Sequence, residues 1–251
     1  MTPISPVQEQ LLEIEATSKQ LISQIQTLRQ QLSAPLPASR YCYFISAGHG
    51  GIDPDGNYTT APNKMFRHNG LALHDGPYFY EGVFNRIIAE KLIDRLRLSN
   101  ITYEKVYHEY KDIKRADRID AVNDYHQNVG PCIYIDLHSN ASRNHDARGF
   151  SVYTSVGQTQ SDQIATTLFH QVGQAFQDVK GFKMRSQEYK DKDVDYEKNF
   201  DSLHKTLCPA ILPEFLFFDQ RDDVQLLMMD KVQEKYADCL FNTILWCESA
   251  L

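Results

Sequence analysis

The chain has 251 residues, of which 42% are hydrophobic, and a formal net charge of −7 at pH 7. This length allows one large domain or two small ones. The acidic balance and the lack of a long basic run argue against a nucleic-acid partner, because phosphate binding needs concentrated Lys and Arg. No apolar stretch approaches the roughly 20 residues that cross a bilayer, so we expect no membrane span.

The first 37 residues predict a separate element. Apolar residues recur from Val7 to Leu32 with alternating spacings of four and three, which is the a/d pattern of a coiled coil. A Pro-rich stretch, residues 33–39, ends this pattern as a linker. An amphipathic helix packed on its own domain would also show a stripe, but the narrow seam favours self-association. We therefore expect residues 1–37 to form a coiled-coil helix and linker that make the protein a homo-oligomer.

From residue 38 onward, strand and helix patterns alternate. This predicts an α/β fold with a mostly parallel twisted sheet and helices on both faces. The expected strands are 41–47, 102–107, 132–137, 149–154 and 210–215. The expected helices are 82–98, 113–125, 161–176 and 224–247. The five cysteines are scattered and form no CxxC pair, so we expect buried free thiols made in a reducing compartment.

Two polar stretches interrupt the alternation. Residues 52–80 form a long segment rich in Gly, Asn, Pro and Tyr, and ordered loops of this length are usually functional or mobile. Residues 183–204 carry mixed charge, which favours a solvated surface loop.

Four ionisable residues stand at the ends of expected elements. His49 follows the first strand within a glycine-rich turn, and His138 follows the strand 132–137. Glu214 lies near the end of the last strand, and Glu81 opens the helix after the long polar segment. Since ligands bind at the carboxyl ends of parallel strands, we expect these side chains to meet at one edge of the sheet.

Two histidines and two carboxylates predict a metal site of the hydrolytic kind. Zinc in hydrolases often has three His or carboxylate ligands and one open position for water. A separate carboxylate near that water then serves as general base. The residue pattern alone leaves other carboxylates open as members of the site, namely Asp136, Asp219, Asp222 and Asp223.

The chain resembles the zinc-dependent N-acetylmuramoyl-L-alanine amidases over about residues 41–247. Four blocks in the family's order carry the resemblance: "ISAGHGG", "EGVFNRIIAEKL", "IYIDLHSNA" and "PAILPEFLFFDQRDDVQLL". The resemblance implies that His49, Glu81 and His138 hold one Zn²⁺ per chain and that Glu214 is catalytic. It makes residues 38–251 a catalytic zinc amidase domain.

The implied reaction is hydrolysis of the amide bond between N-acetylmuramic acid and L-alanine in peptidoglycan. The candidate substrate-binding residues are Asn85, Arg118, Asn140 and Tyr80. The chain departs from the family in the long interval between His49 and Glu81. It also departs in having Leu216 where the family has Gly and Gln220 where the family has Asn, which leaves fine specificity open.

Two other functions remain open at this stage. One is a zinc carboxypeptidase-like peptidase, and the other is a structural component of a phage or injection particle with an accessory amidase domain. The first residues lack a basic segment followed by an apolar one, so we expect no secretory signal peptide. We then expect the protein to stay cytoplasmic until released to the cell wall, as a phage or prophage endolysin does, or to be carried on a phage-like particle.

Overall fold

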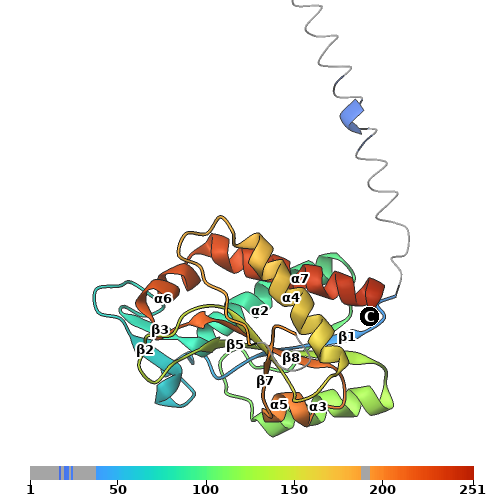
Figure 1. The fold of residues 1–251 in the computed structure, drawn as a ribbon, viewed down its shortest axis with the longest axis horizontal. Coiled ribbons are helices and arrows are strands. Elements are labelled where there is room, and N and C mark those ends of the chain that lie inside the picture. The colour runs from blue at the N-terminus through green and yellow to red at the C-terminus, as the bar shows by residue number, and fades with distance from the viewer. Residues whose placement is uncertain (1–16, 18–19, 23, 25–37, 188–192) are drawn as a thin grey trace, which may run out of the picture. The chain divides into compact units, whose positions relative to one another are not determined.

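The computed structural model describes residues 17, 20–22, 24, 38–187 and 193–251 (Figure 1). The chain divides into two compact units, Met1–Ala38 and Ser39–Leu251. Within the first unit, residues 17, 20–22 and 24 are helical. The rest of the predicted coiled coil and its linker lie outside the described residues.

A six-stranded sheet forms the centre of the second unit, and four of its strands run parallel. Its strand order is β4 (Tyr103–Lys105), β1 (Cys42–Ala47), β5 (Cys132–Asn140), β8 (Ala210–Phe217), β6 (Ser151–Thr154) and β7 (Tyr196–Glu197). Strand β6 runs antiparallel to β8, and β7 pairs parallel with β6. The predicted mostly parallel sheet is confirmed, and β6 adds an antiparallel pairing.

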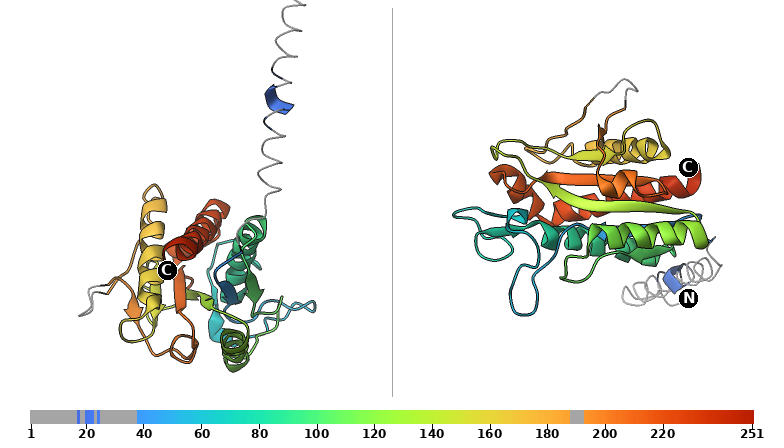
Figure 2. Two further views of the ribbon diagram at one scale, coloured as in Figure 1. Left: turned by 90° about the vertical axis from the view of Figure 1, so that its right-hand side faces the viewer. Right: turned by 90° about the horizontal axis from the view of Figure 1, so that it is seen from below.

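Helices cover both faces of this sheet, as predicted. Figures 1 and 2 show α2 (Glu81–Leu98), α4 (Gln160–Ala175) and α7 (Asp230–Ala250) on one face, and α3 (Arg115–Asn128) and α5 (Asp201–His204) on the other. Helix α2 buries Phe84, Ile88, Leu92 and Leu96 completely. Their four-residue spacing places them on one side of the helix, which packs on β1 and β5.

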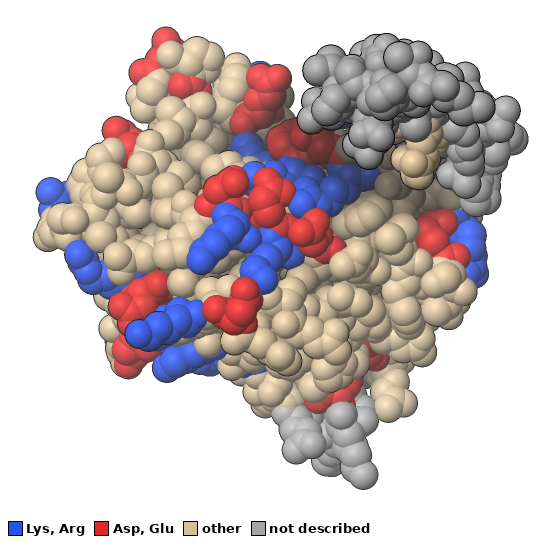
Figure 3. All heavy atoms as spheres, turned by 90° about the horizontal axis from the view of Figure 1, so that it is seen from above, with Lys and Arg blue, Asp and Glu red and all other residues tan. Residues whose placement is uncertain are grey.

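The outer surface of α2 and α7 carries paired charges. Lys91 on α2 contacts Asp230 and Glu234 on α7, and Arg95 contacts Glu234 and Asp238. Figure 3 looks onto this helical face and shows basic and acidic side chains side by side. The network joins the two helices across the surface.

Two expectations differ from the structure. The expected helix 224–247 is two helices, α6 (Arg221–Leu227) and α7, because the chain turns at Met228 and Gln233 donates a hydrogen bond to the buried carbonyl of Leu227 (2.9 Å). The expected surface loop 183–204 contains β7, α5 and the fully buried Asp195. Asp195 can be buried because Thr154 donates a hydrogen bond to its carboxylate. The polar sequence of the segment gives no sign of this distant partner.

The segment 52–80 is folded as well. It contains a short 3₁₀-helix, η1 (Pro62–Lys64), and a hairpin of β2 (Met65–Arg67) and β3 (Tyr78–Tyr80). All five cysteines are buried and free, which confirms the expectation of buried free thiols. Among the described residues no helix is both long and apolar enough to cross a membrane.

Candidate metal and catalytic centre

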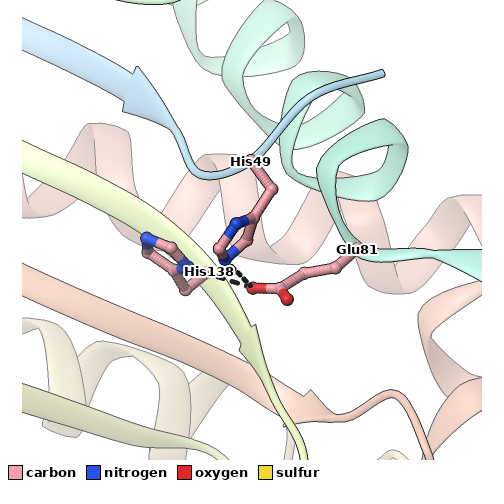
Figure 4. Close-up of side chains that lie close together, drawn as sticks. All are labelled: His49, Glu81 and His138. Carbon is pink, nitrogen blue, oxygen red and sulfur yellow. Dashed lines mark hydrogen bonds and ion pairs between the residues drawn. The ribbon is translucent and has the colours of Figure 1, made fainter. Parts of the chain in front are cut away.

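Three side chains from distant parts of the chain meet at the carboxyl edge of the sheet. His49 comes from the loop after β1, Glu81 is the first residue of α2, and His138 lies in β5 (Figure 4). Oxygen Oε1 of Glu81 is 3.4 Å from Nε2 of His49 and 3.0 Å from Nδ1 of His138. One potential ligand atom from each residue lies within 4.8 Å of the other two. The sequence-based prediction placed these same residues together.

Glycines let the three segments approach so closely. A Cβ on Gly48 would lie 2.1 Å from the His138 ring, and one on Gly82 would lie 1.9 Å from the carbonyl oxygen of Gly50. His49 itself has φ 66°, a left-handed conformation that few residues other than Gly adopt. This strain at His49 turns the chain sharply after β1 and directs the imidazole toward Glu81.

Glu81 is a buried anion surrounded by donors and cations. Its side chain is 1% exposed, Ser139 N–H donates to Oε1 (3.3 Å), and Lys64 Nζ lies 3.5 Å from Oε2. Burial by itself raises the pKa of this carboxyl, but the imidazoles of His49 and His138 outweigh it and bring the pKa to about 2. Glu81 is therefore ionised at neutral pH and available as a ligand.

The two imidazoles differ in their surroundings. Burial lowers the pKa of His49 to about 4, so this ring is neutral at pH 7. Burial opposes protonation of His138 too, but Asp136 and Glu81 raise its pKa to about 10. The carboxylate of Asp136, in turn, has its pKa held below the usual range despite burial, mainly by His138.

The donor set fits a zinc ion. Zinc favours imidazole nitrogen and carboxylate oxygen, and three such ligands leave one position open. Nε2 of His49 and Oε2 of Glu81 are buried and make no hydrogen bond. Buried polar atoms without hydrogen-bond partners are unusual in folded proteins, and a cation bound by these two residues would satisfy them.

Glu214 lies beside His138 in the sheet. The two residues are direct partners in the register of β5 and β8, so their side chains project from the same face. Burial raises the pKa of Glu214 to about 8, with a smaller contribution from Glu81. Its Oε2 is buried without a hydrogen-bond partner. This carboxylate is free to exchange a proton with a group in the cleft.

A cleft of about 600 Å³ opens over these residues. His49, His138 and Glu214 line it, together with Phe200 and with Lys64 from the segment 52–80. The remaining lining residues are Asp112, Ile113, Lys114, Arg115, Arg118, Asp136, Ser202 and Leu212. Sequence reasoning missed Lys64 because no spacing rule connects residue 64 to the two strand ends. The alternation of strand side chains places Asp136 on the same side as His138, and that signal was available.

The four candidate substrate-binding residues have different environments. Asn85 is fully buried and donates to the Gly48 carbonyl (3.1 Å), and Tyr80 is 8% exposed with its ring packed against Tyr58. Asn140 accepts a hydrogen bond from Ala141 N–H (2.9 Å). Arg118 lines the cleft and donates to side chains beneath it.

Three carboxylates that the sequence left open have partners elsewhere. Asp219 binds His145 (2.7 Å), while Asp222 and Asp223 pair with Arg148 at 2.9 and 2.7 Å. These contacts give all three a role in holding the turn after β8. Asp136 is the one carboxylate of the four that reaches the site, 3.5 Å from His138.

Comparison with known proteins identifies the family. A family model described as N-acetylmuramoyl-L-alanine amidase matches residues 44–245. The fold is similar to that of an N-acetylmuramoyl-L-alanine amidase from Clostridium difficile 630, with 22% identity and a TM-score of 0.64 over 85% of this chain and 100% of that one. It is also similar to the amidase AmiC2 of Nostoc punctiforme, with 19% identity and a TM-score of 0.62 over 83% and 97%.

The catalytic domain of the CD27L endolysin, which targets Clostridia difficile, is a further structural neighbour. It has 19% identity and a TM-score of 0.53 over 82% of this chain and 97% of that one. No curated protein matches the sequence. Since the family model covers most of the chain, including the strands and helix that bring the His–Glu–His cluster together, this protein belongs to the N-acetylmuramoyl-L-alanine amidase family of enzymes.

Proposed function

We propose that the protein is a zinc-dependent amidase that cleaves the bond between N-acetylmuramic acid and L-alanine in peptidoglycan. The observation that carries this proposal is the convergence of His49, Glu81 and His138 in one cluster, next to a cleft that His49, His138 and Glu214 line. The family match supports an amidase over the carboxypeptidase-like alternative.

Each residue has a defined task in this reaction. Zinc held by the three ligands would supply a Lewis acid that polarises the scissile carbonyl and lowers the pKa of a water to near 7. Glu214 accepts the water proton and passes it to the nitrogen of the leaving L-alanine. Burial raises the pKa of Glu214 to about 8, so this carboxyl can take up and release a proton near neutral pH.

Metal analysis and two variants test this proposal. The protein should hold about one zinc per chain, as a single three-ligand site requires. His138→Ala should lose zinc, whereas Glu214→Gln should retain it and lose about two to four orders of magnitude in the rate of muropeptide hydrolysis. Wild-type zinc affinity in His138→Ala would contradict the ligand assignment. Near-normal rates in Glu214→Gln would assign the base to another group.

Delivery and assembly are further parts of the proposal. We propose that residues 1–37 self-associate as a coiled coil and that residues 38–251 act as the catalytic domain. We also propose a phage or prophage lytic enzyme that stays in the cytoplasm until it is released to the cell wall, or that is carried on a phage-like particle. The heptad spacing supports the first idea. The endolysin among the structural neighbours is in keeping with the second.

A further inference from the structure

A chain of buried polar side chains runs from the candidate metal centre along one face of the sheet to helix α3. Nε2 of His138 lies 3.5 Å from Oδ1 of Asp136. The same oxygen accepts a hydrogen bond from Ser46 Oγ (2.7 Å), which in turn accepts one from Arg118 Nη1 (2.7 Å). Ser46, Asp136 and Arg118 are 0%, 2% and 7% exposed.

The fold places these groups without a flexible segment between them. Ser46 and Asp136 are direct partners in the register of β1 and β5. Asp136 and His138 are two residues apart in β5, so their side chains leave the same face of the strand. Arg118 reaches them from α3, and its Nη1 is 3.4 Å from Asp136 Oδ1. Because Ser46, Asp136 and Arg118 are buried on strands and a helix, their hydrogen bonds to one another fix the positions of their side chains.

His138 therefore stands between two carboxylates, one at each ring nitrogen. Nδ1 is 3.0 Å from Oε1 of Glu81, and Nε2 faces Asp136. The ring therefore contacts Glu81, another member of the cluster, through Nδ1 and not through Nε2. A carboxylate that accepts the hydrogen of one ring nitrogen fixes the tautomer and leaves the other nitrogen as a metal ligand.

We propose that Asp136 is a positioning residue that holds His138 with Nε2 protonated and Nδ1 directed at the metal, and that Ser46 and Arg118 keep the Asp136 carboxylate in place. This inference rests on the proposed zinc site. In this proposal Arg118 helps to position the metal ligand His138, whereas the sequence resemblance made Arg118 a candidate for substrate binding.

Zinc affinity, measured by competition with a chromophoric chelator, gives the first readout. Asp136→Asn and Asp136→Ala should each bind zinc about 10- to 100-fold more weakly than wild type, the usual effect of losing a partner behind a histidine ligand. Arg118→Met should weaken binding by a smaller factor. Asp120→Asn, the same chemical change on the exposed side of α3, is the matched control and should leave the affinity unchanged.

The tautomer of His138 gives a readout that a merely structural role would not change. In the zinc-loaded full-length protein, long-range ¹H–¹⁵N spectra should show His138 with a protonated Nε2 and a metal-bound Nδ1. Zinc bound through Nε2 would overturn the proposal. So would wild-type zinc affinity in both Asp136 variants, with folding verified by circular dichroism. Absence of zinc binding in the wild-type chain would instead overturn the proposed function, so the two failures are distinguishable.

Discussion

Glu214 should make the metal-free protein less stable as the pH rises. Its pKa is about 8 in the folded chain, against 4.5 for an ordinary Glu, because burial disfavours the charged carboxylate. The folded state therefore binds this proton more tightly than the unfolded state does. The stability that this preference provides is complete below pH 4.5 and is lost as the pH rises through 8. Glu214→Gln, which stays neutral, should abolish that loss.

The two pKa values set the size of the effect. A difference from 4.5 to about 8 corresponds to about 5 kcal/mol between the protonation states. The side chain is partly exposed, and water reduces this figure to about 3 kcal/mol. For a chain of this length, 1 kcal/mol changes the melting temperature by about 2–4 °C. We therefore expect Glu214→Gln to melt about 6–12 °C above wild type at pH 8.5, with little difference at pH 5.

Calorimetry or circular dichroism of chelator-treated protein measures this difference between pH 5 and pH 8.5. Glu104→Gln, a change at an exposed carboxylate on β4, is the control and should follow the wild-type curve. Parallel pH curves for wild type and Glu214→Gln would show that Glu214 holds no proton at neutral pH. That result would refute the assigned electrostatics of the site, and with it the reason for choosing Glu214 as the proton carrier.

Three further predictions concern the surroundings of the site. Gly82→Ala should destabilise the fold by about 1–3 kcal/mol and weaken zinc binding, because the new Cβ would lie 1.9 Å from the Gly50 carbonyl oxygen. The control is Gly173→Ala on α4, where the new Cβ would contact only Met184, at 3.9 Å. Equal losses of stability in the two variants would contradict the packing argument. A chain starting at Ala38 should be monomeric by light scattering and cleave soluble muropeptide at the full-length rate, and a monomeric full-length chain at micromolar concentration would rule out homotypic assembly. Lys64→Met should lower kcat/KM on muropeptide while zinc stays bound, because the ammonium lines the cleft; unchanged kinetics would remove Lys64 from the substrate site.

The main helices and strands were predictable because their apolar residues recur at the spacing that buries one side of a helix or a whole central strand. Strand β1 is apolar except for Ser46 and is buried at all six positions, as is typical of a central parallel strand. The carboxyl ends of β1 and β5 then delivered His49 and His138 to one edge. The helix start at Glu81 was readable from the apolar spacing that follows it.

Other features depend on contacts that no local pattern records. The break between α6 and α7 lies inside a sequence whose helical periodicity continues, and the side-chain hydrogen bond from Gln233 to the Leu227 carbonyl bridges it. Residues 52–80 look like a loop because their strands are three residues long. Lys64 reaches Glu81 through this folded segment, where the Lys64 carbonyl accepts a hydrogen bond from Tyr58 and the Tyr58 hydroxyl accepts one from Gly82 N–H.

Leu216 shows how a departure from the family pattern can preserve the site. It stands where the family has Gly, and its φ of 55° is the left-handed conformation that favours Gly. The position falls where the pairing of β5 and β8 shifts between His138 and Asn140, so β8 carries one extra residue immediately after Glu214. A residue with a Cβ pays roughly 1–2 kcal/mol for this conformation, while full burial of a Leu side chain contributes about 1.5–3 kcal/mol. Since Leu216 is completely buried, the apolar contact offsets the strain, and the irregularity that sets the end of β8 persists without the glycine.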